Sequence, residues 1–446
     1  MLNTKRVACA TLITMLFSNI ALAASDKDID ALRAEIQQMK QAYETRIDML
    51  ESKLNKMEKT QAKAVASALA TPATARRDVK NNSFNPSIGV ILNGQYNKFS
   101  HKEGEIAGFA VGEEGERASE SLAIDHTELN FSANVDDKFF GSTTIALAEH
   151  GGETEVEIEE AYIQTLPAIG LPDGMGIKAG RAFWTLGYLN EHHSHADDFV
   201  DRPLPYRAFL NAAFNDDGAE ISYVLPTDFY TEIGGGLFRG DDFPFGGGDG
   251  SGVGAWSAFA RVGGDIDDNK SWRLGGYALS GEADGSRASN EGVVSFIGDT
   301  DIYVADIRYT WAPTSQQEVI LQGEYFHRKE DGTYEDTGSS TGAVDFHESS
   351  SGWYAQAVYK FDPQWRIGAR YSRLDAHDVP AGLVGSALDS NGNDPETYSA
   401  MLDWTNNEFA RVRLQYNREE LARGEHDDQF VLQYIMSLGA HGAHKY

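Results

Sequence analysis

The feature that most constrains the fold is an alternation of apolar and polar residues, repeated in sixteen short stretches between residues 87 and 446. In the stretch 409–418, for example, Val412 and Leu414 share one parity and Arg413 takes the other. Successive side chains of a β-strand point to opposite faces, so each stretch predicts a strand with one apolar and one polar face. The expected strands lie near 87–100, 121–134, 138–149, 154–166, 174–183, 214–225, 229–238, 252–262, 270–281, 300–311, 316–327, 350–361, 364–375, 396–405, 409–419 and 428–438.

The connections between these stretches form two interleaved sets. The short ones are 135–137, 226–228, 312–315, 362–363 and 406–408, and the long ones, rich in Gly, Ser and acidic residues, include 101–120, 184–213, 282–299 and 331–349. A soluble β-sandwich would also alternate, but it has no reason to sort its connections by length. Short periplasmic turns and long outer loops are typical of bacterial outer-membrane barrels. We therefore predict an all-β fold, a 16-stranded antiparallel transmembrane β-barrel.

Composition excludes two other classes of protein. A helical membrane protein needs several apolar runs of about 20 residues, and beyond the N-terminus the sequence has none. A polar chain that spans a membrane must then do so as a closed barrel. The net charge of −30 argues against a nucleic-acid partner, which requires a basic surface.

Aromatic residues recur near the ends of the expected strands. They are Trp272, Trp311, Trp353, Trp365, Tyr359, Phe361 and Tyr416. Amphipathic rings at these positions would form girdles at the level of the lipid headgroups. Ordinary packing within a sheet is the alternative for any single ring, but the girdle accounts better for the set.

The N-terminus predicts export from the cytoplasm. A basic start at Lys5 and Arg6, an apolar run over 7–20 and the small-residue ending at 21–23 are typical of a signal peptide, residues 1–23. The alternative is an uncleaved anchor. The single cysteine, Cys9, falls inside this segment, so the mature chain would contain no disulfide.

Residues 26–60 carry apolar side chains at steps of three and four, which predicts a coiled coil located in the periplasm. A single amphipathic helix on a membrane surface is the alternative. A three-stranded coil would hold the chain as a homotrimer. Residues 61–86 are expected to be a flexible linker, and residues 87–446 the barrel, in the outer membrane of a Gram-negative bacterium.

Several segments resemble a known group of proteins. They are 81–86 (NNSFNP), 88–96 (IGVILNGQY), 214–218 (FNDDG) and 438–444 (LGAHGAH). These strings are similar to those of Gram-negative outer-membrane porins of the phosphate-selective O and P type, in which a coiled coil precedes the barrel. Some relatives are named zinc-regulated TonB-dependent outer-membrane receptors. The resemblance implies a barrel and transport, but it specifies no substrate.

A TonB-dependent receptor meets a physical objection, because such transporters resemble one another in having a folded plug and a 22-stranded barrel. Sixteen strands instead match porins with a water-filled lumen. We therefore expect a porin for passive diffusion of small hydrophilic solutes or ions. The alternatives are an outer-membrane receptor for metal (zinc) uptake and a structural tether of the outer membrane. The chain contains no enzyme motif, so no catalytic residues are expected.

Six arginines take the parity opposite to the lipid-facing residues and are predicted to line the pore: Arg273, Arg308, Arg366, Arg370, Arg411 and Arg413. Guanidinium groups on one wall would attract anions. The alternative is that they pair with acidic residues such as Glu128, Glu157, Asp306 and Glu324 and make the barrel rigid. Acidic outer loops would favour cations, so the sign of the selectivity stays open.

The longest connection, 184–213, is the third of the outer loops and contains the pattern most typical of a metal site. His192, His193, His195, Asp197 and Asp198 are candidate ligands for zinc, copper or nickel, with no other cofactor expected. The alternative is a solvated polar loop, because adjacent histidines do not converge on one ion without a suitable turn. In porin-like barrels the third outer loop characteristically folds into the pore, so this loop is the predicted constriction.

Overall fold

The computed structural model describes residues 86–101, 104–124, 126–150, 153–246, 252–286, 293–407 and 409–439. The predicted signal peptide, the coiled coil and, apart from Pro86, the linker lie outside these residues, and so do the last seven residues of the chain. Those assignments stay predictions. Within the described ranges, no helix is both long and apolar enough to cross a bilayer.

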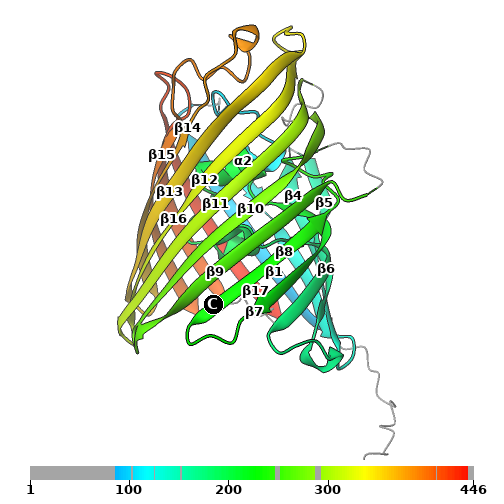
Figure 1. The fold of residues 1–446 in the computed structure, drawn as a ribbon. Coiled ribbons are helices and arrows are strands. Elements are labelled where there is room, and N and C mark those ends of the chain that lie inside the picture. The colour runs from blue at the N-terminus through cyan, green and yellow to red at the C-terminus, as the bar shows by residue number, and fades with distance from the viewer. Residues whose placement is uncertain are drawn as a thin grey trace, which may run out of the picture. The chain divides into compact units, whose positions relative to one another are not determined.

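Antiparallel strands make up most of the described chain (Figure 1). The first half contains β1 (Ser87–Phe99), β2 (Ser121–Ile124), β3 (Thr127–Asn134), β4 (Phe139–His150), β5 (Glu153–Thr165), β6 (Met175–Phe183), β7 (Asn215–Val224), β8 (Tyr230–Phe238) and β9 (Ala255–Asp267). The second half contains β10 (Lys270–Ser286), β11 (Val294–Thr314), β12 (Gln317–Asp336), β13 (Val344–Asp362), β14 (Trp365–Asp375), β15 (Glu396–Asn407), β16 (Ala410–Glu420) and β17 (Asp427–Gly439). One α-helix, α2 (Leu204–Leu210), and five short 3₁₀ turns (Glu113–Gly115, Pro167–Ile169, Leu189–Glu191, Ser194–Ala196 and Ala381–Leu383) lie in the described connections.

The strands close into a ring because β1 pairs with β17 on one side and with β2 and β3 on the other. β2 and β3 are two segments of one barrel strand, interrupted at His126, whose φ is +36°. The ring therefore has sixteen strand positions, and the predicted 16-stranded antiparallel barrel is confirmed. We call the end with the short connections the turn end and the opposite end the loop end.

The predicted long connections 282–299 and 331–349 are wrong in extent. β10 and β11 remain paired as far as Ser286 and Ser295, and β12 and β13 as far as Tyr334 and Val344, so both hairpins project beyond the barrel wall at the loop end (Figure 1). Their inner faces carry apolar rings, among them Phe296. These rings pack on one another and on loop residues in a buried cluster, which explains why the pairing continues through Gly- and Asp-rich sequence.

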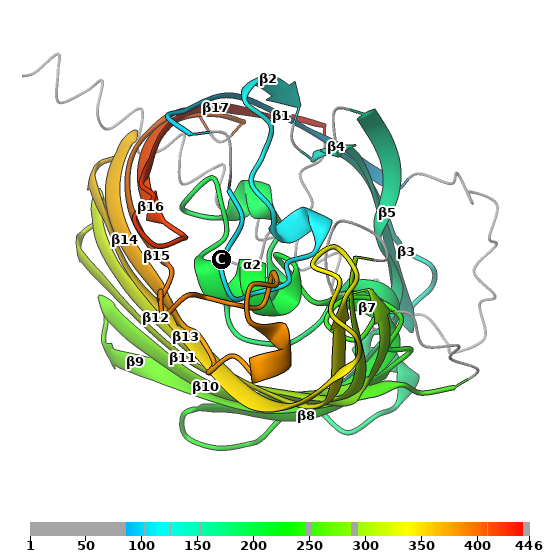
Figure 2. The same cartoon turned by 90° about the horizontal axis from the view of Figure 1, so that it is seen from above.

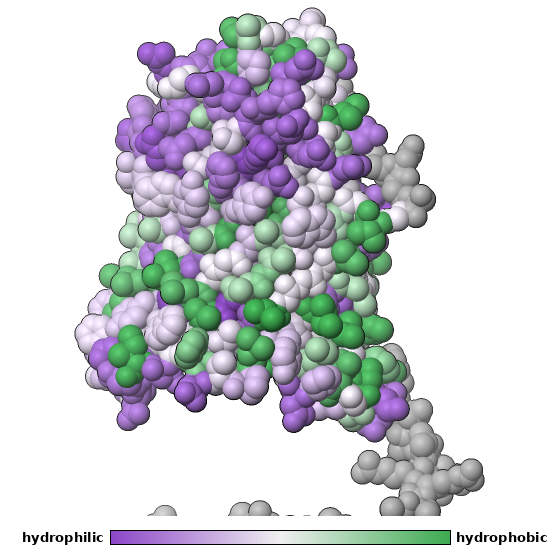
Figure 3. All heavy atoms as spheres, in the orientation of Figure 1, coloured by the Kyte–Doolittle hydropathy of each residue, from purple (hydrophilic) through white to green (hydrophobic). Residues whose placement is uncertain are grey.

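The outer face of the barrel is apolar. Leu402, Leu414 and Leu432 lie in register on three neighbouring strands and are 38–51% exposed. Aromatic residues border this band, with Trp365 paired to Trp404 toward the turn end and Tyr371 paired to Tyr398 toward the loop end. Figure 3 shows polar side chains gathered over the loop end and apolar ones in a band below them. This distribution is typical of a barrel that spans an outer membrane.

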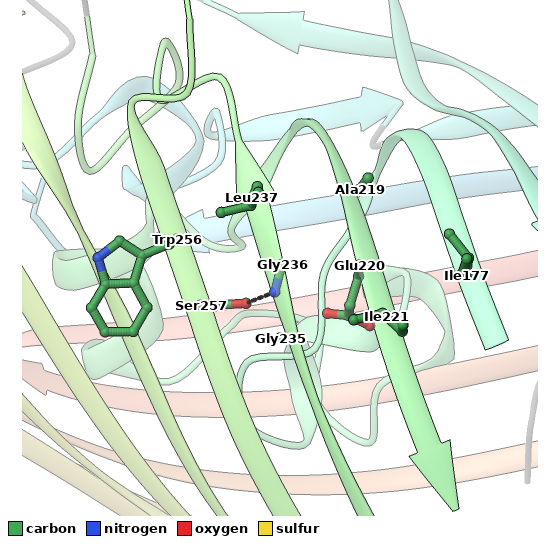
Figure 4. Close-up of a pocket in the computed structure, with 9 residues that line it drawn as sticks. All are labelled: Ile177, Ala219, Glu220, Ile221, Gly235, Gly236, Leu237, Trp256 and Ser257. Atoms are coloured by element: carbon green, nitrogen blue, oxygen red, sulfur yellow. Dashed lines mark hydrogen bonds between the residues drawn. The ribbon is translucent and has the colours of Figure 1, made fainter. Parts of the chain in front are cut away.

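A hollow of about 520 Å³ interrupts the outer face over β6–β9. Gly235 leaves space between the apolar side chains of Ile221, Leu237 and Trp256, as Figure 4 shows. Glu220 comes from the same strand as Ile221 but has the opposite parity, so its side chain lies on the inner side of the wall. The hollow itself is therefore lined by apolar atoms and faces the lipid.

The interior contains folded loops rather than solvent alone. Viewed from the loop end, α2 and the residues around it lie within the ring of strands (Figure 2). Every residue of α2 is buried, and Phe209 packs edge-on against Phe109 of the first loop and beside Phe326 of β12. An apolar core therefore fills part of the barrel, on the side formed by β8–β14.

Replacing Leu414 by arginine should destabilise the barrel by about 2–4 kcal/mol, because the side chain points into lipid midway between the two aromatic bands. Urea titration of folding into phospholipid vesicles measures the change. Val384 is also exposed but lies in a loop, so Val384→Arg is the matched control and should cost little. Equal costs for the two variants would contradict the assignment of the lipid face.

Candidate functional site

The third connection at the loop end, residues 184–214, joins β6 to β7 and is called loop 3 from here on. Asn190, which is fully buried, fastens its two ends together. The Asn190 side chain donates to the carbonyl oxygens of Trp184 (2.7 Å) and Phe214 (3.0 Å) and accepts from the Phe214 N–H (2.6 Å). The Trp184 indole also donates to the carbonyl of Asp216 at 2.8 Å. Loop 3 therefore starts and ends at one rigid, hydrogen-bonded base.

Two carboxylates of the barrel wall then hold the first part of the loop. Glu220 of β7 accepts hydrogen bonds from the backbone and hydroxyl of Thr185, the latter at 2.8 Å. Glu324 of β12 accepts from the backbone N–H of Tyr188 (2.9 Å) and from the hydroxyl of Tyr206 (3.0 Å). Because both carboxylates are buried, each hydrogen bond satisfies an oxygen that would otherwise be costly to remove from water.

The second part of loop 3 forms α2. Pro203 precedes the helix and Pro205 lies in its first turn, where the fixed φ of proline suits a helix and its missing N–H costs nothing. Arg207 within the helix donates to Gly115 of the first loop and pairs with Glu419 of β16 at 2.9 Å. The helix thus connects the first loop, loop 3 and the wall.

The arginines predicted to line the pore all lie on inner-face positions of their strands, and most bind loop 3. Arg366 of β14 pairs with Asp198 of the loop at 2.8 Å and also with Asp403 of β15. Arg370 lies four residues further along β14. It pairs with Asp201 at 2.7 Å and donates to the Asp201 carbonyl at 2.6 Å. Both contacts join residues about 170 positions apart in the chain.

On β16, Arg411 donates to the carbonyl of His195, and Arg413 donates to the carbonyl of Asp197 at 2.7 Å. Arg413 is also paired with Asp403 at 2.8 Å and is 1% exposed. We call Arg366, Arg370, Arg411 and Arg413 the arginine clamp. These four guanidinium groups are directed at loop carbonyls and carboxylates, so much of their charge is offset within the protein.

The remaining two predicted arginines lie on β10 and β11. Arg273 pairs with Asp306 at 3.3 Å, while Arg308 donates to Gln322 at 2.7 Å and lies 4.6 Å from the ring centre of Tyr188 in loop 3. Of the four acids weighed as alternative partners from the sequence, Asp306 does pair with a predicted arginine. Glu128 and Glu324 instead contact loop 3.

The five predicted metal ligands do not come together. His192 turns toward the carbonyl of Tyr188 (2.8 Å), and burial lowers the pKa of its imidazole to about 4. Asp197 is ion-paired with Arg202 of the loop at 2.8 Å, and Asp198 is ion-paired with Arg366 of the arginine clamp. Burial raises the pKa of Asp197 to about 6 although Arg202 opposes the shift.

His193 and His195 point to the opposite side, toward β3 and β5. The Nδ1 atom of His195 is 2.7 Å from one carboxylate oxygen of Glu128, and Nδ1 of His193 is 3.3 Å from the other. The two imidazole rings lie 5.6 Å apart between centroids. Within the described part of the chain, Glu128, His193 and His195 form the one group of three whose ligand atoms converge closely enough to hold a metal ion.

Two consecutive glutamates of β5 complete this cluster. The pairing of β4 with β5 shifts register between Thr144 and Ile145, which leaves Glu159 as the extra residue of a β-bulge. Because of the bulge, Glu159 and Glu160 both face inward. Glu159 lies 3.2 Å from Nδ1 of His193, and Glu160 lies 3.1 Å from its Nε2. Burial is the largest single influence and lowers the pKa of His193, but the charge of Glu128 and the contacts with Glu128, Glu159 and Glu160 together outweigh it and hold the pKa well above the usual value.

The sequence did not identify the three glutamates as site residues. Glu128 is separated from His195 by 67 positions. Alternation along a strand shows that a carboxylate faces inward, but it does not show which inward carboxylate belongs to a site. The bulge did leave a signal. The apolar positions of β5 change parity between Ile158 and Ile163, which requires one residue to be inserted between them.

Replacing Asn190 by alanine should loosen loop 3, because the Trp184 carbonyl and the Phe214 N–H lose a buried partner, at about 1–3 kcal/mol each. The temperature at which the folded barrel loses its fast migration in detergent gels should fall, and proteases should cut the loop sooner. Asn269→Ala, at an exposed turn, is the control and should change neither. An Asn190→Ala barrel as stable as this control would show that the base does not hold the loop.

Comparisons with known proteins place this geometry in context. No model of a known protein family matches the chain. An uncharacterized protein of Aquifex aeolicus (strain VF5) is 28% identical over 392 residues, which cover 82% of this chain and 80% of that protein.

Among solved structures, the outer membrane channel DcaP of Acinetobacter baumannii matches with a TM-score of 0.51 and 14% identity, over 79% of this chain and 97% of that one. An anion-selective porin from Comamonas acidovorans matches with a TM-score of 0.49 and 9% identity, over 79% of this chain and 99% of that one. Because the identity to DcaP is only 14%, the likeness concerns the fold alone. The chain thus has the closed 16-stranded barrel fold of an outer-membrane channel, while the likeness to the porin O and P type and the zinc-receptor label stay predictions.

Proposed function

We propose that the protein is a passive channel of the bacterial outer membrane for small hydrophilic solutes and ions, with loop 3 as its constriction. The observation that carries this proposal is a closed 16-stranded barrel whose third outer loop is folded inside and bound to the inner wall. Barrels of 16–18 strands are wide enough for an aqueous channel, whereas the plugged outer-membrane transporters have 22 strands. Polar and charged residues on the inner face supply the wet surface that such a path needs.

The charges around loop 3 favour cations. The arginine clamp is directed at Asp198, Asp201 and Asp403 and at loop carbonyls, so it offers little free positive charge to a passing anion. On the other side of the loop, three glutamates gather around His193, with Lys178 at 3.7 Å from Glu160. Fixed charge of one sign at a constriction raises the local concentration of the opposite ion.

Assembly and location follow from the sequence. The predicted coiled coil at 26–60 supports a homotrimer, and the predicted signal peptide together with the apolar outer band supports the outer membrane of a Gram-negative bacterium. The coiled coil would then lie in the periplasm.

Single-channel recording in planar lipid bilayers tests the proposal. The purified protein should produce stepwise ohmic currents in KCl, in groups of three for a trimer. A KCl gradient should give a reversal potential of the sign expected for K⁺ over Cl⁻. The two alternatives from the sequence, a zinc-uptake receptor and a structural tether, predict no such steps. Absence of conductance from correctly folded barrels would refute the channel.

Removing the charge of Asp201 should weaken the preference for cations, because this carboxylate is 27% exposed and offsets Arg370. For Asp201→Asn we expect the K⁺ to Cl⁻ permeability ratio to fall by about two- to fivefold, the factor that corresponds to about 0.4–1 kcal/mol for a partly screened charge. Reversal potentials measure this ratio. Asp345 points outward above the barrel, so Asp345→Asn should leave it unchanged. A ratio in Asp201→Asn that equals the wild-type value would contradict loop 3 as the selective constriction.

A further inference from the structure

The cluster between loop 3 and the β3–β5 wall has the dimensions of a metal site. Zinc ligands at about 2.0–2.2 Å from a tetrahedral ion lie about 3.3–3.5 Å from one another. Nδ1 of His193 lies 3.3 Å from Glu128 and 3.2 Å from Glu159, close to that spacing. Nδ1 of His195 lies 2.7 Å from the second oxygen of Glu128, so a small outward movement of that ring completes the set.

Two buried atoms of the cluster lack a hydrogen bond. Oε2 of Glu159 and Nδ1 of His193 face each other at 3.2 Å, but their geometry is not that of a hydrogen bond and neither atom has another such partner. Buried polar atoms are nearly always satisfied, so each orphan requires an explanation. An ion bound by both atoms supplies one.

The surroundings of His193 are those of a metal-bound imidazole. Its second ring nitrogen, Nε2, is hydrogen-bonded to Glu160 at 3.1 Å. A carboxylate on the far nitrogen of a ligating histidine fixes the orientation of the ring and increases its basicity. Lys178, 3.7 Å from the other oxygen of Glu160, fixes that carboxylate in turn.

We propose that Glu128, Glu159, His193 and His195 bind one divalent transition-metal ion of the Zn²⁺ class, with Glu160 orienting His193. The set of two imidazole nitrogens and two carboxylate oxygens suits Zn²⁺ and neighbouring first-row ions and is too nitrogen-rich for Ca²⁺ or Mg²⁺. A metal ion binds only a deprotonated Nδ1, so any proton on that atom is released on binding. The ion offsets the charge of the glutamates without the need for a protonated imidazole.

Such an ion would cross-link loop 3 to the wall. His193 and His195 belong to the loop, whereas Glu128 and Glu159 belong to β3 and β5. The arginine clamp fixes residues 195–201 to β14 and β16. The metal therefore adds a second attachment on the side of the loop that the clamp does not reach, and makes the stiffness of the constriction dependent on metal in the outer medium.

Isothermal titration of the chelator-treated, detergent-folded full chain with ZnCl₂ tests the proposal. We expect one Zn²⁺ per chain for the wild type and loss of this site in the His193→Ala/His195→Ala double variant. Glu160→Gln, which keeps the size of the side chain, should weaken binding by about 10–100-fold. His192→Ala is the matched control, because this neighbour faces the other side of the loop and should bind as the wild type does. Migration in detergent gels verifies that each variant is folded.

Two outcomes would overturn the proposal. One is zinc affinity that is the same in the wild type and the folded double variant, and the other is an affinity that falls as much in His192→Ala as in the double variant. Co²⁺ provides a second readout, since a four-coordinate site gives intense visible absorption that the double variant should lack. Titration in detergent does not depend on conductance. A chain that conducts without binding zinc would refute the metal site alone, and one that binds zinc without conducting would refute the channel alone.

Discussion

The closure of β1 on β17 is the constraint on which the rest of the structure depends. In lipid, a strand with an unpaired edge would expose backbone N–H and C=O groups that nothing could satisfy, so the sheet must close into a ring. A ring of sixteen strands leaves an interior too wide for wall side chains to fill. Period-two alternation then makes that interior polar, and loop 3 enters it with its own apolar core around α2. The closed wall thus both creates the space and provides the polar groups that hold the loop.

Buried charge is what holds the loop in one position. A guanidinium such as Arg413, 1% exposed, is tolerable inside only because Asp403 and two further acceptors satisfy it. Displacement of loop 3 would take the Asp197 carbonyl from Arg413, and a buried donor left without its acceptor costs about 1–3 kcal/mol. Glu324 acts in the same way with backbone and tyrosine donors on the far side of the lumen. The interior charges therefore fix the position of loop 3, in addition to setting the electrostatic potential that a passing ion meets.

The sequence predicted which face each strand residue occupies, because parity is a local property. Leu414 is exposed to lipid and Arg413 is buried inside, as alternation requires. The sequence could not predict which inner-face charges pair with each other. The contact of Arg370 with Asp201, for example, joins residues 169 positions apart and depends on how loop 3 folds. The histidine-rich stretch was recognisable as unusual, but its backbone sends His192 and His193 to opposite sides. The long hairpin arms were missed because their pairing depends on Phe296 packing against other arms and loops, and not on local alternation.

The bulge at Glu159 connects the local alternation of β5 with the long-range contacts of loop 3. Without the inserted residue, alternation along β5 would send Glu160 into lipid beside Ile158, where a carboxylate is not tolerated. With it, two consecutive carboxylates enter the lumen from one strand, at the height where His193 crosses. Directly after the bulge, β5 pairs with β6 through only four residues, 161–164. One extra residue in β5 therefore brings two of the three carboxylates that face His193 into the lumen.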